Sequence, residues 1–112
     1  YRSLMSVLDN TTFIFLDDVR IAPSRTWITA KTAEEAYELV IAAVKEDIAI
    51  VISLDHDLGE FIPTGYDLLN WIEKDIATTD FRPNIAFSIH SANPVGRVRM
   101  EQAIRAIEAR LR

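Results

Sequence analysis

Ionisable side chains follow three of the short apolar runs in this chain. The runs and the residues after them are 13–16 with Asp17 and Asp18, 48–54 with Asp55, His56 and Asp57, and 85–89 with His90 and Ser91. A single aspartate after a strand is usually a turn or cap residue, but several carboxylates at one edge repel each other unless a cation or shifted pKa values relieve them. Mg²⁺ or another divalent metal would do so through carboxylate oxygens and waters. We therefore expect these aspartates to hold a metal: Asp17, Asp18, Asp55 and Asp57.

Both histidines of the chain, His56 and His90, belong to these clusters. Alone, His90 would more often be a hydrogen-bonded interior residue and His56 a turn residue. Paired across neighbouring strand ends, they suit general acid–base chemistry near neutral pH, one activating water and the other protonating a leaving oxygen. Arg20 and Arg97 are candidate phosphate clamps, because a guanidinium meets phosphate oxygens bidentately. Each arginine alone is more often a surface residue.

A sheet must bring these residues together. The sequence predicts strands over residues 13–16, 26–29, 48–54 and 85–89, and helices over 32–46, 64–76 and 93–111. Strands separated by helices indicate a mostly parallel sheet, which binds ligands beyond the carboxyl ends of its strands. The connection over residues 19–25 is short for a parallel crossover. We therefore expect the second strand to be irregular or to pair differently.

Composition limits the classes of protein that the chain can represent. Its 112 residues, 49% of them hydrophobic, fit a single globular domain over residues 1–112. The absence of cysteine excludes disulfides and thiolate metal sites and favours a reducing compartment. No apolar run is long enough to cross a bilayer, so we expect a cytoplasmic protein without a membrane partner.

Charge is unevenly distributed along the chain. The formal net charge of -5 argues against general binding to duplex DNA. The last sixteen residues are nevertheless locally basic, with five arginines against Glu101 and Glu108 in residues 97–112. A solvated helix face is a simpler explanation of that run than a phosphate-binding role.

Three segments carry a resemblance to a known family. They are FLDDVR at residues 15–20, SLDHDLG at 53–59 and HSANPVGR at 90–97. Together they resemble the receiver-related family proposed to process cyclic phosphates, from about Phe13 to Arg105. The resemblance implies an α/β, three-layer, receiver-like (flavodoxin-like) fold, with a mostly parallel sheet of about four strands that is truncated after the helix following the fourth strand. It also implies a metal- or histidine-assisted activity on cyclic phosphates of RNA ends or nucleotides.

Ordinary response-regulator receivers supply a second comparison. Asp17 and Asp18 resemble their acidic pair, Asp55 resembles their phosphoacceptor, and Ser91 resembles their hydroxyl-bearing switch residue. No fifth strand supplies the usual lysine, which argues against two-component signalling.

Three functional hypotheses follow from these residues. The first is a phosphodiesterase that opens a cyclic phosphate, with His56, His90 and Asp55 as catalytic residues and with phosphate bound by Arg20, Ser91, Asn93 and Arg97. The second is a phosphoacceptor module that uses Asp55. The third is a nucleotide-binding module without turnover. The two histidines favour the enzyme, because neither phosphoacceptance nor binding alone gives a reason to place both at the edge.

Overall fold

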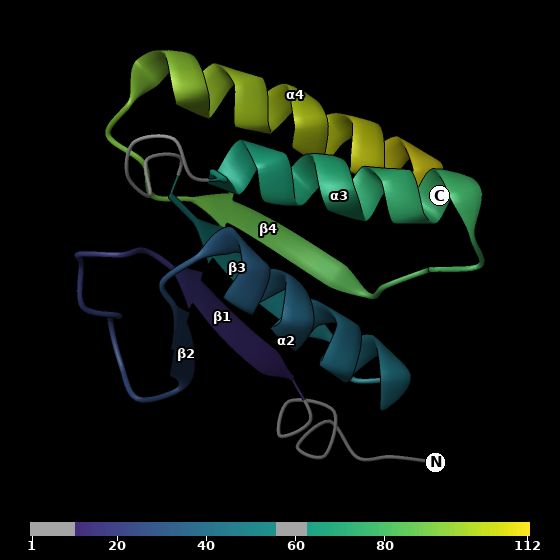
Figure 1. Ribbon diagram of the computed structural model, residues 1–112, viewed down its shortest axis with the longest axis horizontal. Helices are drawn as coiled ribbons and strands as arrows, with labels where there is room; N and C mark the ends of the chain where they lie inside the picture. The colour runs from purple at the N-terminus through teal and green to yellow at the C-terminus, as the bar shows by residue number, and fades with distance from the viewer. Residues whose placement is uncertain (1–10, 56–62) are drawn as a thin grey trace.

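Four parallel strands and three helices make up the computed structural model, which describes residues 11–55 and 63–112. The strands are β1 (Thr12–Leu16), β2 (Trp27–Ala30), β3 (Ile50–Leu54) and β4 (Ile85–Ile89), and the helices are α2 (Ala33–Lys45), α3 (Gly65–Thr78) and α4 (Pro94–Leu111). The strand order in the sheet is β2-β1-β3-β4 (Figure 1). The predicted receiver-like α/β fold with a four-stranded parallel sheet is confirmed.

The second strand differs from the expectation. It is regular and pairs in parallel with β1, from Phe13 opposite Trp27 to Leu16 opposite Ala30. The expectation of an irregular or differently paired strand was wrong, because the chain has only a short distance to cover between the end of β1 and the start of β2. A four-residue strand spans only about 13 Å, and the loop over residues 17–26 can cover that distance without a helix.

Side-chain caps begin the three described helices, and each cap is the residue at which a predicted helix starts. The hydroxyl of Thr32 accepts a hydrogen bond from the Glu35 amide at the start of α2, while the Glu35 carboxylate accepts from the Lys31 amide. Thr64 forms a capping box at α3, and the side chain of Asn93 caps α4 just before Pro94. These caps satisfy amides that have no partner within the helix, and so determine where each helix begins.

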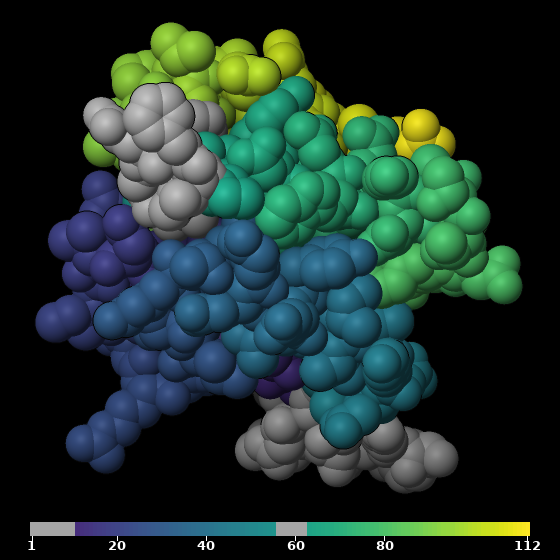
Figure 2. Space-filling model, viewed as in Figure 1, coloured from purple at the N-terminus to yellow at the C-terminus, as the bar shows by residue number. Residues whose placement is uncertain are grey.

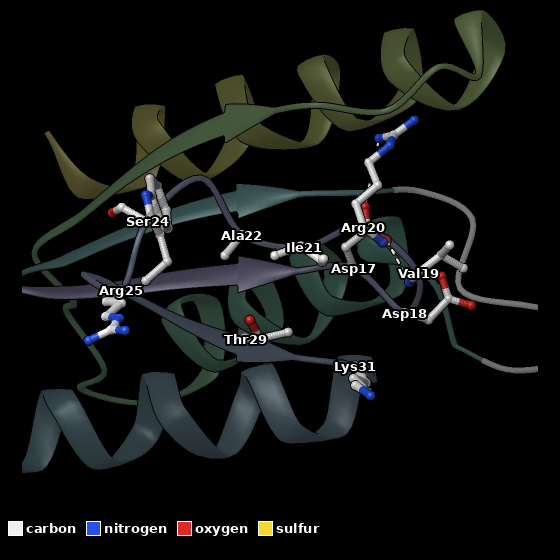
Figure 3. A pocket seen from close by; sticks show the side chains of 11 residues that line it. Asp17, Asp18, Val19, Arg20, Ile21, Ala22, Ser24, Arg25, Thr29 and Lys31 are labelled. Atoms are coloured by element: carbon white, nitrogen blue, oxygen red, sulfur yellow. Dashed lines mark hydrogen bonds and ion pairs between the residues drawn. The ribbon is translucent and has the colours of Figure 1, made fainter.

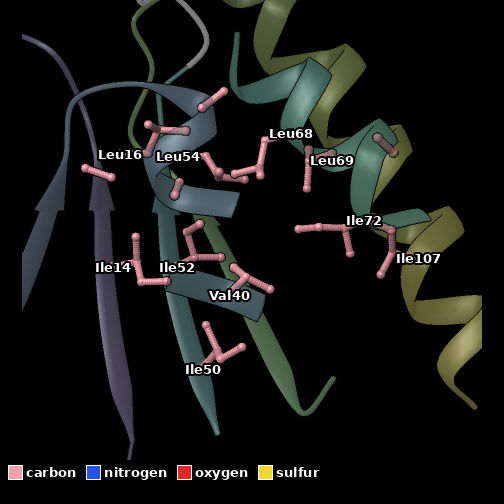
Figure 4. Close-up of a cluster of buried hydrophobic side chains, with 14 of the residues drawn as sticks. Ile14, Leu16, Val40, Ile50, Ile52, Leu54, Leu68, Leu69, Ile72 and Ile107 are labelled. Atoms are coloured by element: carbon pink, nitrogen blue, oxygen red, sulfur yellow. The ribbon is translucent and has the colours of Figure 1, made fainter. Parts of the chain in front are cut away.

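One face of the sheet carries the hydrophobic core. Alternation along the strands directs Ile14, Leu16, Ile52 and Leu54 to this face, where they meet fully buried side chains of the helices. These include Val40 of α2, Leu68, Leu69 and Ile72 of α3, and Ile107 of α4 (Figure 4). In the space-filling view α2 and α3 lie next to each other on the side toward the viewer (Figure 2). Side chains of α2, α3 and α4 all join the core on this face of the sheet, so the described residues form two of the three layers that the resemblance implies.

The opposite face carries Phe13, Phe15, Trp27 and Ser53, each one residue out of phase with the core positions. The loop after β1 passes over this face (Figure 3). Among the described residues no helix is both long and apolar enough to cross a membrane.

Candidate functional site

The register of the sheet aligns the residues that follow three adjacent strands. Leu16 of β1 lies opposite Leu54 of β3, and Leu54 lies opposite Ile89 of β4. The ladder extends one residue further, because the Asp55 amide donates to the Leu16 carbonyl at 3.1 Å and the His90 amide donates to the Leu54 carbonyl at 2.9 Å. Asp17, Asp55 and His90 consequently form one row at the carboxyl edge of the sheet.

Asp17, Asp55 and His90 also bring potential ligand atoms together. One carboxylate oxygen from each aspartate and one ring nitrogen of His90 all lie within 4.8 Å of one another. Asp17 is only 1% exposed and Asp55 8% exposed, while the His90 side chain retains 19%. Two carboxylates so close together and so buried repel strongly unless positive charge offsets them.

Hydrogen bonds stabilise the ionised form of Asp17. Burial by itself would raise the pKa of this carboxyl group. The amides of Arg20 and Val19 donate to its Oδ1 at 2.8 and 2.9 Å, and His90 Nε2 lies 2.9 Å from its Oδ2. These contacts outweigh burial and hold the pKa of Asp17 below its ordinary value. The site therefore contains a carboxylate that stays ionised at neutral pH.

The ring of His90 is fixed on both of its nitrogens. Nε2 contacts Asp17, and Nδ1 lies 2.7 Å from the Ser53 hydroxyl. The ring also stacks on Phe15, with centroids 4.3 Å apart and planes 7° from parallel. In the neutral tautomer that donates from Nε2 to the carboxylate, Nδ1 accepts from the hydroxyl. His90 is thus held in place by three neighbours and connects Ser53 to Asp17.

Sequence reasoning singled out neither Ser53 nor Phe15 as a site residue. A signal was present for Ser53, because it is the polar residue of β3 and stands two positions before Asp55, on the same face of the strand. Phe15 carried no such signal. Phe15 belongs to β1 and stacks on the residue that follows β4, which lies two strands away in the sheet. Such a contact depends on the strand order.

Arg20 provides positive charge at the same place. Its Nη1 donates to the His90 carbonyl at 2.6 Å and lies 3.7 Å from Asp17 Oδ2. The side chain is 47% exposed, so its remaining N–H groups can reach a ligand. Arg20, Asp17 and Asp55 line a hollow of about 250 Å³ together with Asp18, Val19 and Ala92. Figure 3 shows Arg20 beside Asp17 at the end of β1.

Gly65 sets the position of Asp55. At the first position of α3, a Cβ on this residue would lie 2.3 Å from the Asp55 carbonyl oxygen and 3.1 Å from Met100 Sδ. Both distances are shorter than ordinary van der Waals contact, so only glycine lets the start of α3 approach the end of β3 this closely. The need for glycine at this position thus has a specific cause next to the candidate site.

Other predicted site residues that the structure describes are not part of the cluster of Asp17, Asp55 and His90. Asp18 is exposed and lines the hollow without joining the three clustered ligands. Ser91 is buried and accepts a hydrogen bond from the Asn93 amide at 3.1 Å, while the Asn93 side chain accepts from Gly96. The predicted catalytic His56 and metal ligand Asp57 lie outside the described residues.

Arg97 is not brought to the carboxylates. Its Nη1 donates to the Ile89 carbonyl at 3.1 Å, and its Nε pairs with Glu101 at 3.2 Å. It lines a separate hollow along β4 and α4. Of the two predicted phosphate clamps, Arg20 is therefore the one that lies beside Asp17 and Asp55.

Comparison with protein families gives one match. Residues 12–106 match the family described as cyclic-phosphate processing receiver domain. This range includes every element of the sheet and each of the residues that form the cluster. No significant match was found among curated proteins or among solved structures.

Proposed function

The chain belongs to the cyclic-phosphate processing receiver domain family, and from this premise we propose that it hydrolyses a cyclic phosphodiester of a nucleotide or an RNA end. In this reaction water attacks phosphorus, one P–O ester bond of the ring breaks, and the released oxygen takes a proton. The product is a phosphomonoester. The observation that carries the proposal is the buried cluster of Asp17, Asp55 and His90 beside Arg20 at the binding edge of a parallel sheet.

A divalent cation fits this donor set. Carboxylate oxygens are the preferred ligands of Mg²⁺ and Mn²⁺, and a cation would offset the repulsion between two carboxylates that are almost fully buried. We propose Asp17 and Asp55 as the residues that hold the ion. When bound, it would polarise the phosphoryl oxygens and stabilise the charge that develops on them.

His90 and Ser53 support Asp17 in this proposal. A hydrogen bond from an imidazole orients a ligating carboxylate, and the loss of such a partner typically lowers metal affinity or activity about 10- to 100-fold. Both ring nitrogens of His90 already contact protein atoms. We therefore assign it to positioning, and His56, which follows Asp55 in the sequence, stays our candidate proton carrier.

Arg20 would bind the phosphate group. Its guanidinium is anchored through Nη1 to the His90 carbonyl and is half-exposed above the hollow. A guanidinium offers several donors in one plane and so can hold phosphate oxygens while one N–H remains bonded to the protein. This anchor already restricts the rotamers of Arg20, so less conformational entropy is lost when the phosphate binds.

The test is turnover of a nucleoside 2′,3′-cyclic phosphate followed by ³¹P NMR, with Mn²⁺ or Mg²⁺ and with a chelator. We expect a phosphomonoester product that depends on the metal. The variants Asp17→Asn and Asp55→Asn should each lower kcat/KM by at least about 100-fold. Asp80→Asn is the matched control, since Asp80 is exposed and lies outside the cluster.

Two results would contradict the proposal. One is a wild-type chain that leaves cyclic nucleotides and cyclic-ended RNA unchanged with either metal. The other is turnover that survives both Asp17→Asn and Asp55→Asn. Incubation with acetyl phosphate and Mg²⁺ tests the alternative phosphoacceptor function, because a phosphoryl group on Asp55 would appear in the intact mass.

A further inference from the structure

A second and larger hollow adjoins the candidate site. It has a volume of about 520 Å³ and lies between the loop after β1 and the edge strand β2. Residues 17–20 line both hollows and so connect them. Figure 3 shows Ile21 and Ala22 of the loop above the strands, and Thr29 and Lys31 on the β2 side. Its volume is typical of clefts that bind small molecules.

Part of the wall of this hollow is apolar and open to solvent. Val19 is 82% exposed and Ile21 is 92% exposed, although both are large aliphatic side chains. Trp27 lines the same hollow, and its ring is held edge-on by Phe13 and Phe15 at 5.5 and 6.1 Å between centroids. A ligand with a flat apolar body would cover these side chains and remove apolar surface from water.

Lys31 lies at the end of this hollow that is nearest to the candidate site. Ala30 pairs with Leu16, so Lys31 and Asp17 follow neighbouring strand ends at the same edge of the sheet. Adjacent strands are about 4.8 Å apart. Among residues 11–55 and 63–112, no carboxylate forms an ion pair with the Lys31 ammonium. Lys31, which has no ion-pair partner in the part of the chain that the structure describes, therefore follows the strand next to the one that ends at the proposed phosphate site.

We propose that this hollow binds the nucleoside part of the substrate and that Lys31 binds a second phosphate group of the same ligand. The inference rests on the proposed function for the position of the first phosphate. A second phosphate can come from two sources: a 5′-phosphate on a free nucleotide, or the preceding phosphodiester of an RNA chain. Their shared chemistry is a nucleotide that carries two phosphate groups, and an ammonium ion suits either as a point charge.

Binding of product-like phosphomonoesters tests the inference without any turnover. The three ligands are adenosine 3′-monophosphate, adenosine 3′,5′-bisphosphate and a diadenosine with a terminal 3′-phosphate, titrated calorimetrically at one salt concentration. We expect one or both of the ligands with two phosphate groups to bind about tenfold more tightly than the monophosphate. Lys31→Gln should abolish this difference. Lys74→Gln, a change at an exposed lysine of α3 outside the hollow, should preserve it.

The ligands also distinguish the two sources. Tighter binding of the bisphosphate would show that a 5′-phosphate on a free nucleotide is enough to provide the second phosphate group. Tighter binding of the dinucleotide alone would identify the phosphodiester of an RNA chain as that group. The inference is overturned if Lys31→Gln retains the preference, if no preference exists, or if none of the ligands binds saturably. A chain that binds in this way but does not open cyclic phosphates would refute the proposed function and leave the inference intact.

Discussion

Gly65→Ala tests whether the start of α3 determines the position of Asp55. The new Cβ would lie 2.3 Å from the Asp55 carbonyl oxygen, whereas carbon and oxygen normally approach to about 3.3 Å. The two backbones must therefore separate by about 1 Å. Met100 is fully buried and its Sδ would lie 3.1 Å from the Cβ, so it restricts movement in that direction.

The energetic cost follows from this geometry. Overpacking of a buried contact costs about 1–3 kcal/mol, and alanine recovers about 0.5–1 kcal/mol through its lower entropy in the unfolded chain. We expect a net loss of about 1–2 kcal/mol in the free energy of unfolding, measured by urea denaturation. The variant should still fold, because the free energy of unfolding of small domains is about 5 kcal/mol or more.

Metal binding separates a local displacement from a general loss of stability. Ile76→Val, near the other end of α3 from Gly65, should cost a similar amount of about 0.5–1.5 kcal/mol while leaving Asp55 in place. In a titration with Mn²⁺, Gly65→Ala should bind at least about tenfold more weakly than Ile76→Val. The reasoning would be refuted by a Gly65→Ala variant that is as stable as wild type, or by one that is destabilised but binds Mn²⁺ as Ile76→Val does.

Two further predictions concern pH. The pKa of Asp17 is lowered in the folded state, so its ionised form adds stability that is complete above about pH 3.9 and is lost as the pH falls through the folded value. Below pH 4, the free energy of unfolding should therefore fall less steeply in Asp17→Asn than in wild type, and parallel curves would contradict this. The hydrogen bond from the Tyr37 hydroxyl to Asp75, together with burial, raises the pKa of Tyr37. Stability from this contact is present below about pH 10 and is lost as the pH rises through the folded pKa. Tyr37→Phe should cost about 1 kcal/mol at neutral pH and flatten the alkaline decline, and an unchanged alkaline curve would disprove the assignment.

Local patterns were sufficient to predict the elements and their order. The apolar run at residues 13–16 and the mostly apolar run at 48–54 predicted strands, because a strand in the centre of a parallel sheet has little need for polar positions. Capping residues such as Thr32, Thr64 and Asn93 marked the helix starts, because their side chains satisfy amides close to them in the sequence. Both signals are local, so one sequence contains them in full.

These local patterns could not predict how β2 pairs. Whether a short strand can lie parallel to its predecessor depends on the path of the connecting loop through space, and residues 17–26 cross the sheet without a helix. The usual length of a connection between parallel strands is a statistical guide, and it reflects connections that contain a helix.

The residue types that follow the strands at the candidate site can be read from the sequence alone: Asp17, Asp55 and His90 each come after an apolar run. Their meeting depends on the three-dimensional fold, because the register aligns their backbones and the loop amides orient Asp17. The structure also shows that the ring of His90, which the sequence suggested as a proton carrier, contacts Ser53, Phe15 and Asp17. Hydrogen bonds and stacking between strands depend on distances of a few ångströms across the sheet, and these do not follow from spacing along the chain.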